Sequence, residues 1–303
     1  MELKRRSRSA NSKAKRQTDI LLGPGLMLLL VALLGLLVSG CGSSASTEGP
    51  VPLRRAHAHN DYEHDRPLYD ALDHGFTSVE ADVHLVDDQL LVAHDPDEVE
   101  EGKTLQSLYL DPLRERVEAN GGSVYPDGPQ VTLLVDVKTE AESTYQALHE
   151  VFQEYEDILT VFGPESREDG PVVVIISGNR TRETMAQQDV RYAAYDGRME
   201  DLVSDDPATL IPLISDRWTD HFSWRGSDEM PESEREKLVR IVERAHEDGR
   251  RVRFWATPDF DLPAREAVWQ ELVNADVDLI NTDKLKALQQ FLLENDPSVQ
   301  SLD

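Results

Sequence analysis

The fold and the site both depend on residues 56–95, which read AHAHNDYEHDRPLYDALDHGFTSVEADVHLVDDQLLVAHD. In this stretch Glu80 and Asp82 alternate with apolar residues, and the period of two of a β-strand places both side chains on one face. Two carboxylates on one face repel each other and are costly to bury unless a cation lies between them. Oxygen ligands of this kind favour Mg²⁺ or Ca²⁺. The pair therefore predicts either a divalent metal site or a solvated, acidic edge strand.

Histidines lie near predicted strand ends on both sides of this pair. His59 follows a short strand-like run that begins at Leu53, and His94 ends the apolar run Leu90–Ala93. An imidazole titrates close to neutral pH, so two of them can serve as a general base and a general acid. The histidines favour a metal-assisted enzyme site over a solvated strand.

The order of these motifs resembles that of the TIM-barrel phosphodiesterases. This superfamily includes glycerophosphodiester phosphodiesterases, spider-venom sphingomyelinase D enzymes and phosphatidylinositol-specific phospholipases C. The branch that the chain resembles most is the family of altered-inheritance-of-mitochondria protein six. The A-H-N-D-Y of that family is matched by Ala58–Tyr62, and the E-x-D and H-D of the superfamily are matched by Glu80/Asp82 and His94/Asp95.

The resemblance implies a role for each matched residue. His59 and His94 would be the catalytic pair, and Glu80 and Asp82 would bind a divalent metal, either Mg²⁺ or Ca²⁺. The D-x-K motif at the end of the predicted strand 131–138 would add a third metal ligand and a cation that contacts phosphate. These two residues are Asp136 and Lys138. A salt bridge at a strand end is the alternative interpretation of the D-x-K motif.

Further residues are expected to contact the substrate. Glycerophosphodiesterases usually have H-R-G at the first histidine, where this chain has Asn60, so an arginine that would touch phosphate is missing. Arg180 could replace it, because Asn179 and Arg180 follow the predicted strand 172–176. Trp255 matches an aromatic residue that the superfamily places in its pocket. A helix cap is the alternative role of Asn179, and packing in the barrel is that of Trp255.

Strand-like and helical patterns alternate along the rest of the chain, which predicts a single α/β domain with the TIM (β/α)₈ barrel fold of phospholipase C-like phosphodiesterases. In such barrels the site lies at the carboxyl ends of the strands. The eight expected strands are 53–58, 78–84, 131–138, 172–176, 191–195, 210–215, 252–256 and 277–281.

The amino-terminal sequence predicts export. Seven Lys and Arg residues precede the apolar run Leu26–Val38, and the V-S-G-C that ends at Cys41 resembles the lipobox of bacterial lipoproteins. We expect lipidation at Cys41 and an exported bacterial lipoprotein, anchored to the membrane in the cell envelope. An uncleaved signal anchor and an ordinary cleaved signal are the alternatives. The expected organisation is a lipoprotein signal peptide with its lipobox, a flexible tether, the barrel domain and a tail, at 1–41, 42–52, 53–295 and 296–303.

Composition excludes several classes of protein. The chain has 31 basic and 58 acidic residues, a formal net charge of −27, so electrostatic binding to nucleic acid is excluded. Its single cysteine excludes a disulfide within the chain and a thiolate metal cluster.

These expectations combine into a divalent-metal-dependent phosphodiester hydrolase with two histidines as acid and base. Its partner would be a phosphodiester substrate, for which a lipid headgroup, a glycerophosphodiester and an inositol phospholipid all stay open. Water or a hydroxyl of the substrate could be the nucleophile. A tethered, non-catalytic binding module is the main alternative. An amidohydrolase-type metal enzyme, suggested by the H-x-H of His57 and His59, is less favoured, because no histidine ends the fifth or sixth expected strand.

Overall fold

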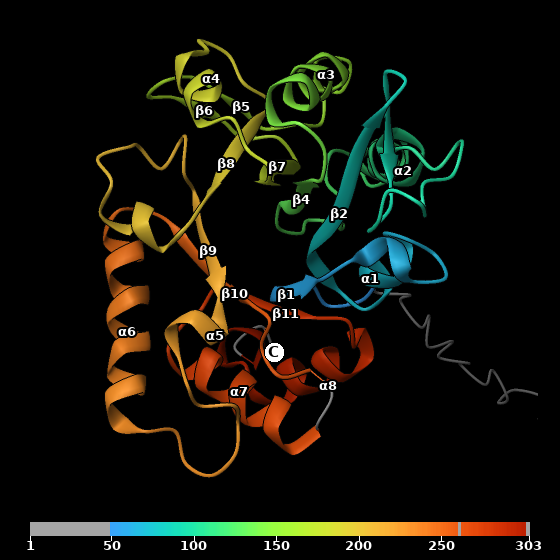
Figure 1. Cartoon of the computed structure of the whole chain (residues 1–303). Helices are drawn as coiled ribbons and strands as arrows, with labels where there is room; N and C mark the ends of the chain where they lie inside the picture. Colours follow the sequence, from blue (N-terminus) through green and yellow to red (C-terminus); the bar gives the residue numbers. More distant parts are fainter. Residues whose placement is uncertain (1–48, 260–261, 301–303) are drawn as a thin grey trace, which may run out of the picture. The chain divides into compact units, whose positions relative to one another are not determined.

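The computed structural model describes residues 49–259 and 262–300 (Figure 1). Eight parallel strands form a closed ring, in which each strand pairs with the next along the chain and the last pairs with the first. In order around the ring they are β1 (Leu53–Ala58), β2 (Phe76–Val86), β4 (Val131–Val137), β7 (Val172–Gly178), β8 (Ala193–Gly197), β9 (Leu213–Arg217), β10 (Arg251–Trp255) and β11 (Leu279–Thr282). The predicted α/β barrel is therefore confirmed.

Three further strands lie beside the ring. β3 (Gln89–Val92) pairs antiparallel with β2 and extends it as a hairpin, as the turn at Asp87 and Asp88 indicates. β5 (Val161–Phe162) and β6 (Arg167–Glu168) form a separate two-stranded hairpin that the sequence pattern did not predict.

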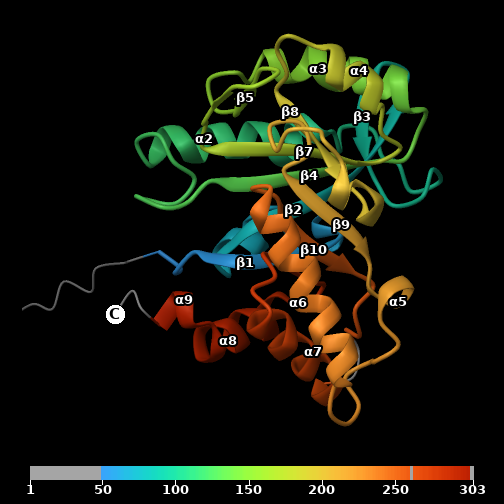
Figure 2. The same ribbon diagram turned by 90° about the vertical axis from the view of Figure 1, so that its left-hand side faces the viewer.

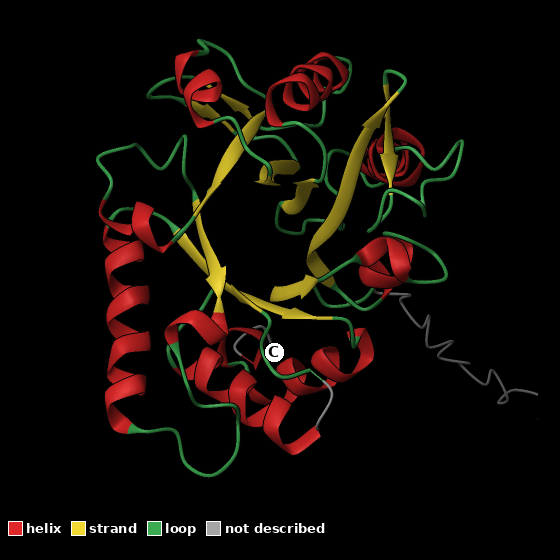
Figure 3. Ribbon diagram, in the orientation of Figure 1, coloured by secondary structure: helices red, strands yellow, loops and turns green. Residues whose placement is uncertain are grey.

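Helices surround the strands (Figure 3). Figure 2 shows α2, α3 and α4 over one side of the ring and α6, α7 and α8 along the other. The helices are α1 (Tyr69–Asp73), α2 (Asp111–Ala119), α3 (Ala141–Gln153), α4 (Arg182–Gln187), α5 (Trp218–His221), α6 (Glu232–Glu247), α7 (Leu262–Asn274), α8 (Leu285–Asn295) and α9 (Pro297–Gln300). Short 3₁₀ segments span Asp61–Glu63 and Met199–Val203, and a π-helical turn at Gln106–Leu110 leads into α2.

The pleat of the strands divides the core into two parts. In β4, Leu133 and Val135 belong to the large apolar cluster between the strands and the helices, while Leu134 belongs to a smaller cluster. The smaller cluster also contains Ile175 of β7 and Leu213 of β9. Because successive side chains of a strand point to opposite faces, this smaller cluster fills the inside of the ring. The remaining interior positions are mostly polar, and they build the candidate site.

The amino-terminal expectations lie outside the described residues. These are the signal peptide, the lipobox with Cys41 and most of the tether, up to residue 48. Within the described part of the chain, no helix has both the length and the apolar character needed to span a bilayer.

Candidate active site

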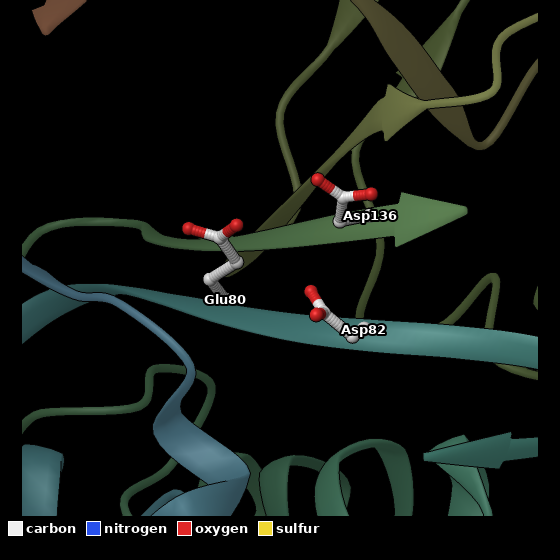
Figure 4. A group of neighbouring side chains, drawn as sticks. All are labelled: Glu80, Asp82 and Asp136. Carbon is white, nitrogen blue, oxygen red and sulfur yellow. The ribbon is translucent and has the colours of Figure 1, made fainter. Parts of the chain in front are cut away.

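Three carboxylates converge at the carboxyl ends of two neighbouring strands. Asp82 of β2 lies directly beside Asp136 of β4 in the parallel register, and Glu80 is two residues earlier on the same face of β2. One oxygen atom of each carboxylate lies within 4.8 Å of the others. Figure 4 shows the three side chains pointing towards one another from the two strands. The alternation within β2 predicted the common face of Glu80 and Asp82, and Asp136, which the family resemblance singled out as a third ligand, lies beside them.

Glu80 is held in the ionised form. Its Oε2 is 2.5 Å from Nη2 of Arg253 and 3.0 Å from Nε2 of His57, and all three side chains are buried. Burial alone would raise the pKa of Glu80, but the Arg253 charge and the His57 hydrogen bond hold it well below its usual range. Arg253 is a residue that the sequence analysis missed, although an arginine two residues before Trp255 on a barrel strand was the available signal.

His57 is a neutral, structural histidine. Burial and the nearby charge of Arg253 lower the pKa of its imidazole to about 3. Since the Glu80 carboxylate can only accept, Nε2 of His57 carries the proton and donates it. Nδ1 then accepts from the hydroxyl of Ser78 at 2.7 Å. This arrangement uses both ring nitrogens and orients Glu80.

Asp82 and Asp136 share the ammonium group of Lys138. Nζ of Lys138 is 2.9 Å from Oδ2 of Asp82 and 3.4 Å from Oδ1 of Asp136. Burial and the charge of Glu80 raise the pKa of Asp136 to about 6. Oδ1 of Asp82 is buried without a hydrogen-bond partner among the described residues. The three carboxylates offer only oxygen donors, one of these oxygens is buried and unpaired, and one carboxylate has a raised pKa. These features fit a hard divalent cation, so these three residues could bind a metal.

His94 lies beside the carboxylates through a contact with Asp82. Its Nδ1 is 3.0 Å from Oδ2 of Asp82, and the hydroxyl of Tyr62 donates to the same oxygen at 2.8 Å. The side chain of His94 is half exposed. Because Nδ1 faces Asp82, Nε2 is the ring nitrogen left for proton transfer. Tyr62 was quoted in the A-H-N-D-Y motif, but its contact with Asp82 could not be deduced from the motif.

His59 is oriented by a carboxylate from the other end of the chain. Its Nδ1 is 2.7 Å from Oδ1 of Asp283, which directly follows β11. Burial acts against a charged imidazole, but the hydrogen bond to Asp283 and the charge of Glu80 hold the pKa of His59 above its ordinary value. The two residues meet because β1 pairs with β11 and closes the ring.

The remaining predicted residues have contacts of their own. Asn60 is in the left-handed region and donates to Glu63 at 3.3 Å, while Asn179 donates to the backbone carbonyls of Lys138 and Thr139 at 3.2 and 2.8 Å. Neither asparagine is hydrogen-bonded to the three carboxylates among the described contacts. Asn179 therefore holds the segment that carries Lys138.

Arg180 and Trp255 are both engaged with other side chains. The guanidinium of Arg180 is 4.7 Å from the centroid of the Tyr195 ring. Its Nε and Nη1 are buried and have no hydrogen-bond partner in the described part of the chain. Trp255 ends β10, and its ring lies 5.5 Å from the guanidinium of Arg217. Arg180 thus presents unused donors, as a phosphate contact requires.

A second polar cluster at the ends of β7 and β8 was not singled out from the sequence. Asp196 is fully buried and accepts from Nη1 of Arg198 and from the hydroxyl of Ser177, both at 2.7 Å. These residues line the same end of the ring, because Asp196 and Arg198 follow the interior position Ala194 by two and four residues.

Comparisons with known proteins agree with this geometry. The family described as AIM6-like phosphodiesterase domain matches residues 47–196, and the glycerophosphoryl diester phosphodiesterase family matches residues 251–286. The chain belongs to the superfamily of TIM-barrel phosphodiesterases. Within that superfamily it is similar to the AIM6-like phosphodiesterase family over residues 47–196.

Curated relatives and solved structures are similar over most of the chain. Altered inheritance of mitochondria protein 6 homolog of Arthroderma benhamiae is 29% identical, over 81% of this chain and 85% of the relative. Altered inheritance of mitochondria protein 6 of Eremothecium gossypii is 28% identical, over 79% and 69%. The phosphatidylinositol-specific phospholipase C from Listeria monocytogenes is 10% identical with a TM-score of 0.45, over 83% of this chain and 96% of that chain. A glycerophosphoryl diester phosphodiesterase from Parabacteroides distasonis is 12% identical with a TM-score of 0.47, over 82% and 89%.

These relatives correct the expected location. The curated relatives are fungal proteins, and this contradicts the expectation of an exported bacterial lipoprotein with a signal peptide and a lipid anchor at Cys41. An apolar run followed by one short motif is a weak signal, whereas the likeness to the first of these relatives extends over 81% of the chain. We therefore do not retain the lipoprotein assignment, the envelope location or the membrane anchor.

Proposed function

We propose that the chain is a divalent-metal-dependent phosphodiester hydrolase. One observation carries this proposal: the carboxylates of Glu80, Asp82 and Asp136 converge, and Asp82 also contacts His94. His59 lies at the same end of the ring, directly after β1, and a hydrogen bond with Asp283 orients its imidazole. Ligands for a cation and two oriented imidazoles are what acid–base catalysis of phosphodiester cleavage needs.

The three carboxylates would hold the cation, which is Mg²⁺ or Ca²⁺ on the basis of its oxygen ligands. When bound, the cation would neutralise the negative charge that develops on the phosphoryl oxygens. Asp82 faces Nδ1 of His94 and Asp283 faces Nδ1 of His59, so each carboxylate orients an imidazole and leaves its Nε2 for proton transfer. One histidine would then take a proton from the nucleophile while the other gives a proton to the leaving oxygen.

The substrate is proposed to be a phosphodiester held by donors at the rim of the ring. Arg180 supports this part of the proposal, because its Nε and Nη1 have no partner among the described residues. Lys138 would contact a phosphoryl oxygen next to the cation, since its ammonium already lies among the carboxylates. Asn60, Asn179 and Trp255 would contribute to the walls of the site. A lipid headgroup diester is one substrate of this chemistry.

The test is hydrolysis of bis(p-nitrophenyl) phosphate by the full chain in EDTA, in Mg²⁺ and in Ca²⁺. We expect turnover in one of the two metals and none in EDTA. His59→Ala and His94→Ala should each lower kcat by about 100-fold or more, as removal of a positioned acid or base does. His149→Ala is the matched control, because His149 lies on α3 and packs between Tyr145 and Tyr192. Equal losses in the control, or full activity in both site variants, contradict the assignment.

A non-catalytic binding module is the second candidate. Lys138 and Arg253 pair with the carboxylates without any metal, so the charges of the site are already partly balanced. Titration calorimetry with Mg²⁺ and Ca²⁺ separates the two candidates. A metal affinity that Asp136→Asn weakens, without turnover of a broad panel of phosphodiesters, would favour the binding module.

A further inference from the structure

A cavity of about 460 Å³ lies at the end of the ring opposite to the carboxylates. It is lined by residues that begin the barrel strands or directly precede them, including Arg54 of β1, Thr77 of β2, Thr132 of β4 and Arg251 of β10. The carboxylates and their histidines lie at the other ends of the same strands. The cavity is therefore separate from the candidate active site, and its volume is that of a site for a small molecule.

The lining of this cavity is basic, although the chain as a whole has a net charge of −27. Four arginines, Arg54, Arg55, Arg167 and Arg251, face two aspartates. The aspartates, Asp276 and Asp278, complete the charged lining. A positive cavity in such an acidic protein concentrates anions locally.

Two of the arginines are already paired with carboxylates. Arg55 is 2.6 Å from Asp276 and 3.2 Å from Asp296, and Arg167 is 2.5 Å from Asp169. Asp278 is occupied as well, because it accepts from His246 at 2.9 Å and from the backbone N–H of Val252 at 2.8 Å. The lining carboxylates are thus engaged elsewhere.

Arg54 and Arg251 make no ion pair with any residue that the structure describes. The one hydrogen bond that the side chain of Arg251 donates in the described structure goes from Nη1 to the hydroxyl of Thr132, at 3.2 Å. Burial lowers the pKa of Arg251, which shows that its surroundings do not compensate the charge fully. A partly buried guanidinium without a carboxylate partner is costly, and an anion from solution would reduce that cost.

We propose that this cavity binds a small multivalent oxyanion, held by the guanidinium groups of Arg251 and Arg54 at the amino-terminal end of the barrel. The forked donors of an arginine fit the oxygens of phosphate and carboxylate groups equally well. The shared chemistry is therefore a compact polyanion, and either an organic phosphate or a polycarboxylate can supply it.

This site is physically distinct from the proposed catalytic site. Arg251 and Arg253 lie on the same face of β10, two positions apart, which corresponds to about 6.6 Å along a strand. The guanidinium of Arg253 is already engaged with Glu80 and with Asn281. An anion at Arg251 consequently has its own binding residues.

The test is titration calorimetry of the full chain with inorganic pyrophosphate and with citrate, in EDTA and at constant ionic strength. We expect one saturable site for at least one of the two anions, and the tighter ligand identifies phosphate or carboxylate as the natural group. R251Q should weaken binding by about tenfold or more, since it removes a charge-assisted hydrogen bond in a partly buried position. R54Q, whose side chain is exposed, should weaken binding less and keeps the test valid if R251Q does not fold.

Two variants serve as controls. R240Q changes an exposed arginine of α6, and R180Q changes an arginine at the catalytic end, so both should bind the anion as the unmodified chain does. Binding that R180Q weakens and R251Q does not would place the anion at the catalytic end and overturn the proposal. Heat changes that depend only on ionic strength, or no saturable binding of either anion, would overturn it as well. None of these outcomes depends on phosphodiester hydrolysis.

Discussion

Asp61 is a carboxylate that the fold buries without a basic partner in contact. Its Oδ2 accepts from the backbone N–H of Leu68 at 2.5 Å and from the hydroxyl of Tyr109 at 3.0 Å, while its Oδ1 is buried and unpaired among the described residues. Burial raises the pKa of Asp61 to about 6, although both hydrogen bonds act in the opposite direction. The residue therefore makes stability depend on pH.

Asp61→Asn should stabilise the protein at neutral pH. Between the unfolded pKa of Asp and the folded value of about 6, the folded state retains a proton that the unfolded state releases, so stability falls as pH rises. Above about pH 6 the folded state carries the full cost of burying the ionised Asp61, which is at most about 3 kcal/mol of stability for a pKa shift of this size. The asparagine oxygen can accept both hydrogen bonds without this cost. Urea unfolding from pH 4 to pH 8 should show a gain that grows up to about pH 6 and then levels off.

Asp70→Asn is the matched control for this measurement. Asp70 is partly exposed and accepts from Nε of Arg66 at 2.8 Å. The backbone and side-chain hydrogen bonds from Arg66 hold its pKa below the ordinary value, against the effect of burial. Its loss should lower stability slightly at neutral pH, within about 1 kcal/mol, as for an exposed ion pair. If the difference in unfolding free energy between Asp61→Asn and the unmodified chain is the same at all pH values, the assigned pKa of Asp61 is wrong.

Individual site residues differed in how well the sequence predicts them. The common face of Glu80 and Asp82 follows from local alternation, because the period of a strand alone decides it, whereas Asp136 was predicted as a ligand from the D-x-K motif. The partner of His59, Asp283, is 224 residues away in sequence, and Arg253 is 173 residues from Glu80. Closure of the ring brings these pairs together, and no local pattern carries that information.

At the scale of elements, the strand ends were less predictable than the strands. The expected fifth and sixth strands end at Tyr195 and Ser215, whereas β8 and β9 continue to Gly197 and Arg217. Apolar runs mark a strand only where both faces are apolar, and these ends carry polar side chains on the interior face. Asp196 is fully buried in this way. Polar residues inside a barrel are therefore a reason to extend a predicted strand.

The end of β7 depends on a glycine beside the carboxylates. Gly178 has a φ of +68°, and a Cβ at this position would overlap Oδ1 of Asp136 and the carbonyl oxygen of Val137. Gly178→Ala should therefore displace Asp136, weaken metal binding and lower stability by about 2–4 kcal/mol, the sum of backbone strain and overpacking. Thermal unfolding and Mg²⁺ titration measure the two effects.

Gly121→Ala separates strain from displacement. Gly121 has a similar φ of +73°, but an added Cβ would have open space around it. Apart from the two neighbouring residues of the chain, no described atom lies within 4 Å of its position. Only the backbone cost of about 1 kcal/mol therefore applies. Its metal affinity should equal that of the unmodified chain. If Gly121→Ala and Gly178→Ala are destabilised equally and both keep the metal affinity, Gly178 does not position Asp136.

At the scale of the whole molecule, the barrel separates opposite charges along its axis. Carboxylates gather at the carboxyl ends of the strands, the buried Arg253 lies in the middle, and unpaired arginines lie at the amino-terminal ends of the strands that the structure describes. The apolar cluster around Leu134 and Ile175 accounts for only part of the interior. Each end is therefore suited to a ligand of its own, a cation with a phosphodiester at one end and a free oxyanion at the other.

The net charge of −27 predicts how the protein responds to salt. Repulsion among surface carboxylates destabilises the compact state, and the screening length falls from about 10 Å at 0.1 M salt to about 3 Å at 1 M. The unfolding temperature at pH 7 should therefore rise with NaCl over this range, by several degrees, since each kcal/mol corresponds to about 2–4 °C in a chain of this size. KCl should have the same effect, because screening does not depend on the cation.

Mg²⁺ tests whether any stabilisation beyond screening comes from the three carboxylates. At equal ionic strength, MgCl₂ should raise the unfolding temperature more than NaCl, because a ligand that binds only the folded state adds its own contribution. Asp136→Asn should remove this excess while leaving the response to NaCl unchanged, since it alters one charge among 58 acidic residues. An excess that survives in Asp136→Asn would mean that Mg²⁺ acts at the general acidic surface. An unfolding temperature that falls with NaCl would mean that specific ion pairs, such as Arg253 with Glu80, outweigh the repulsion of the net charge.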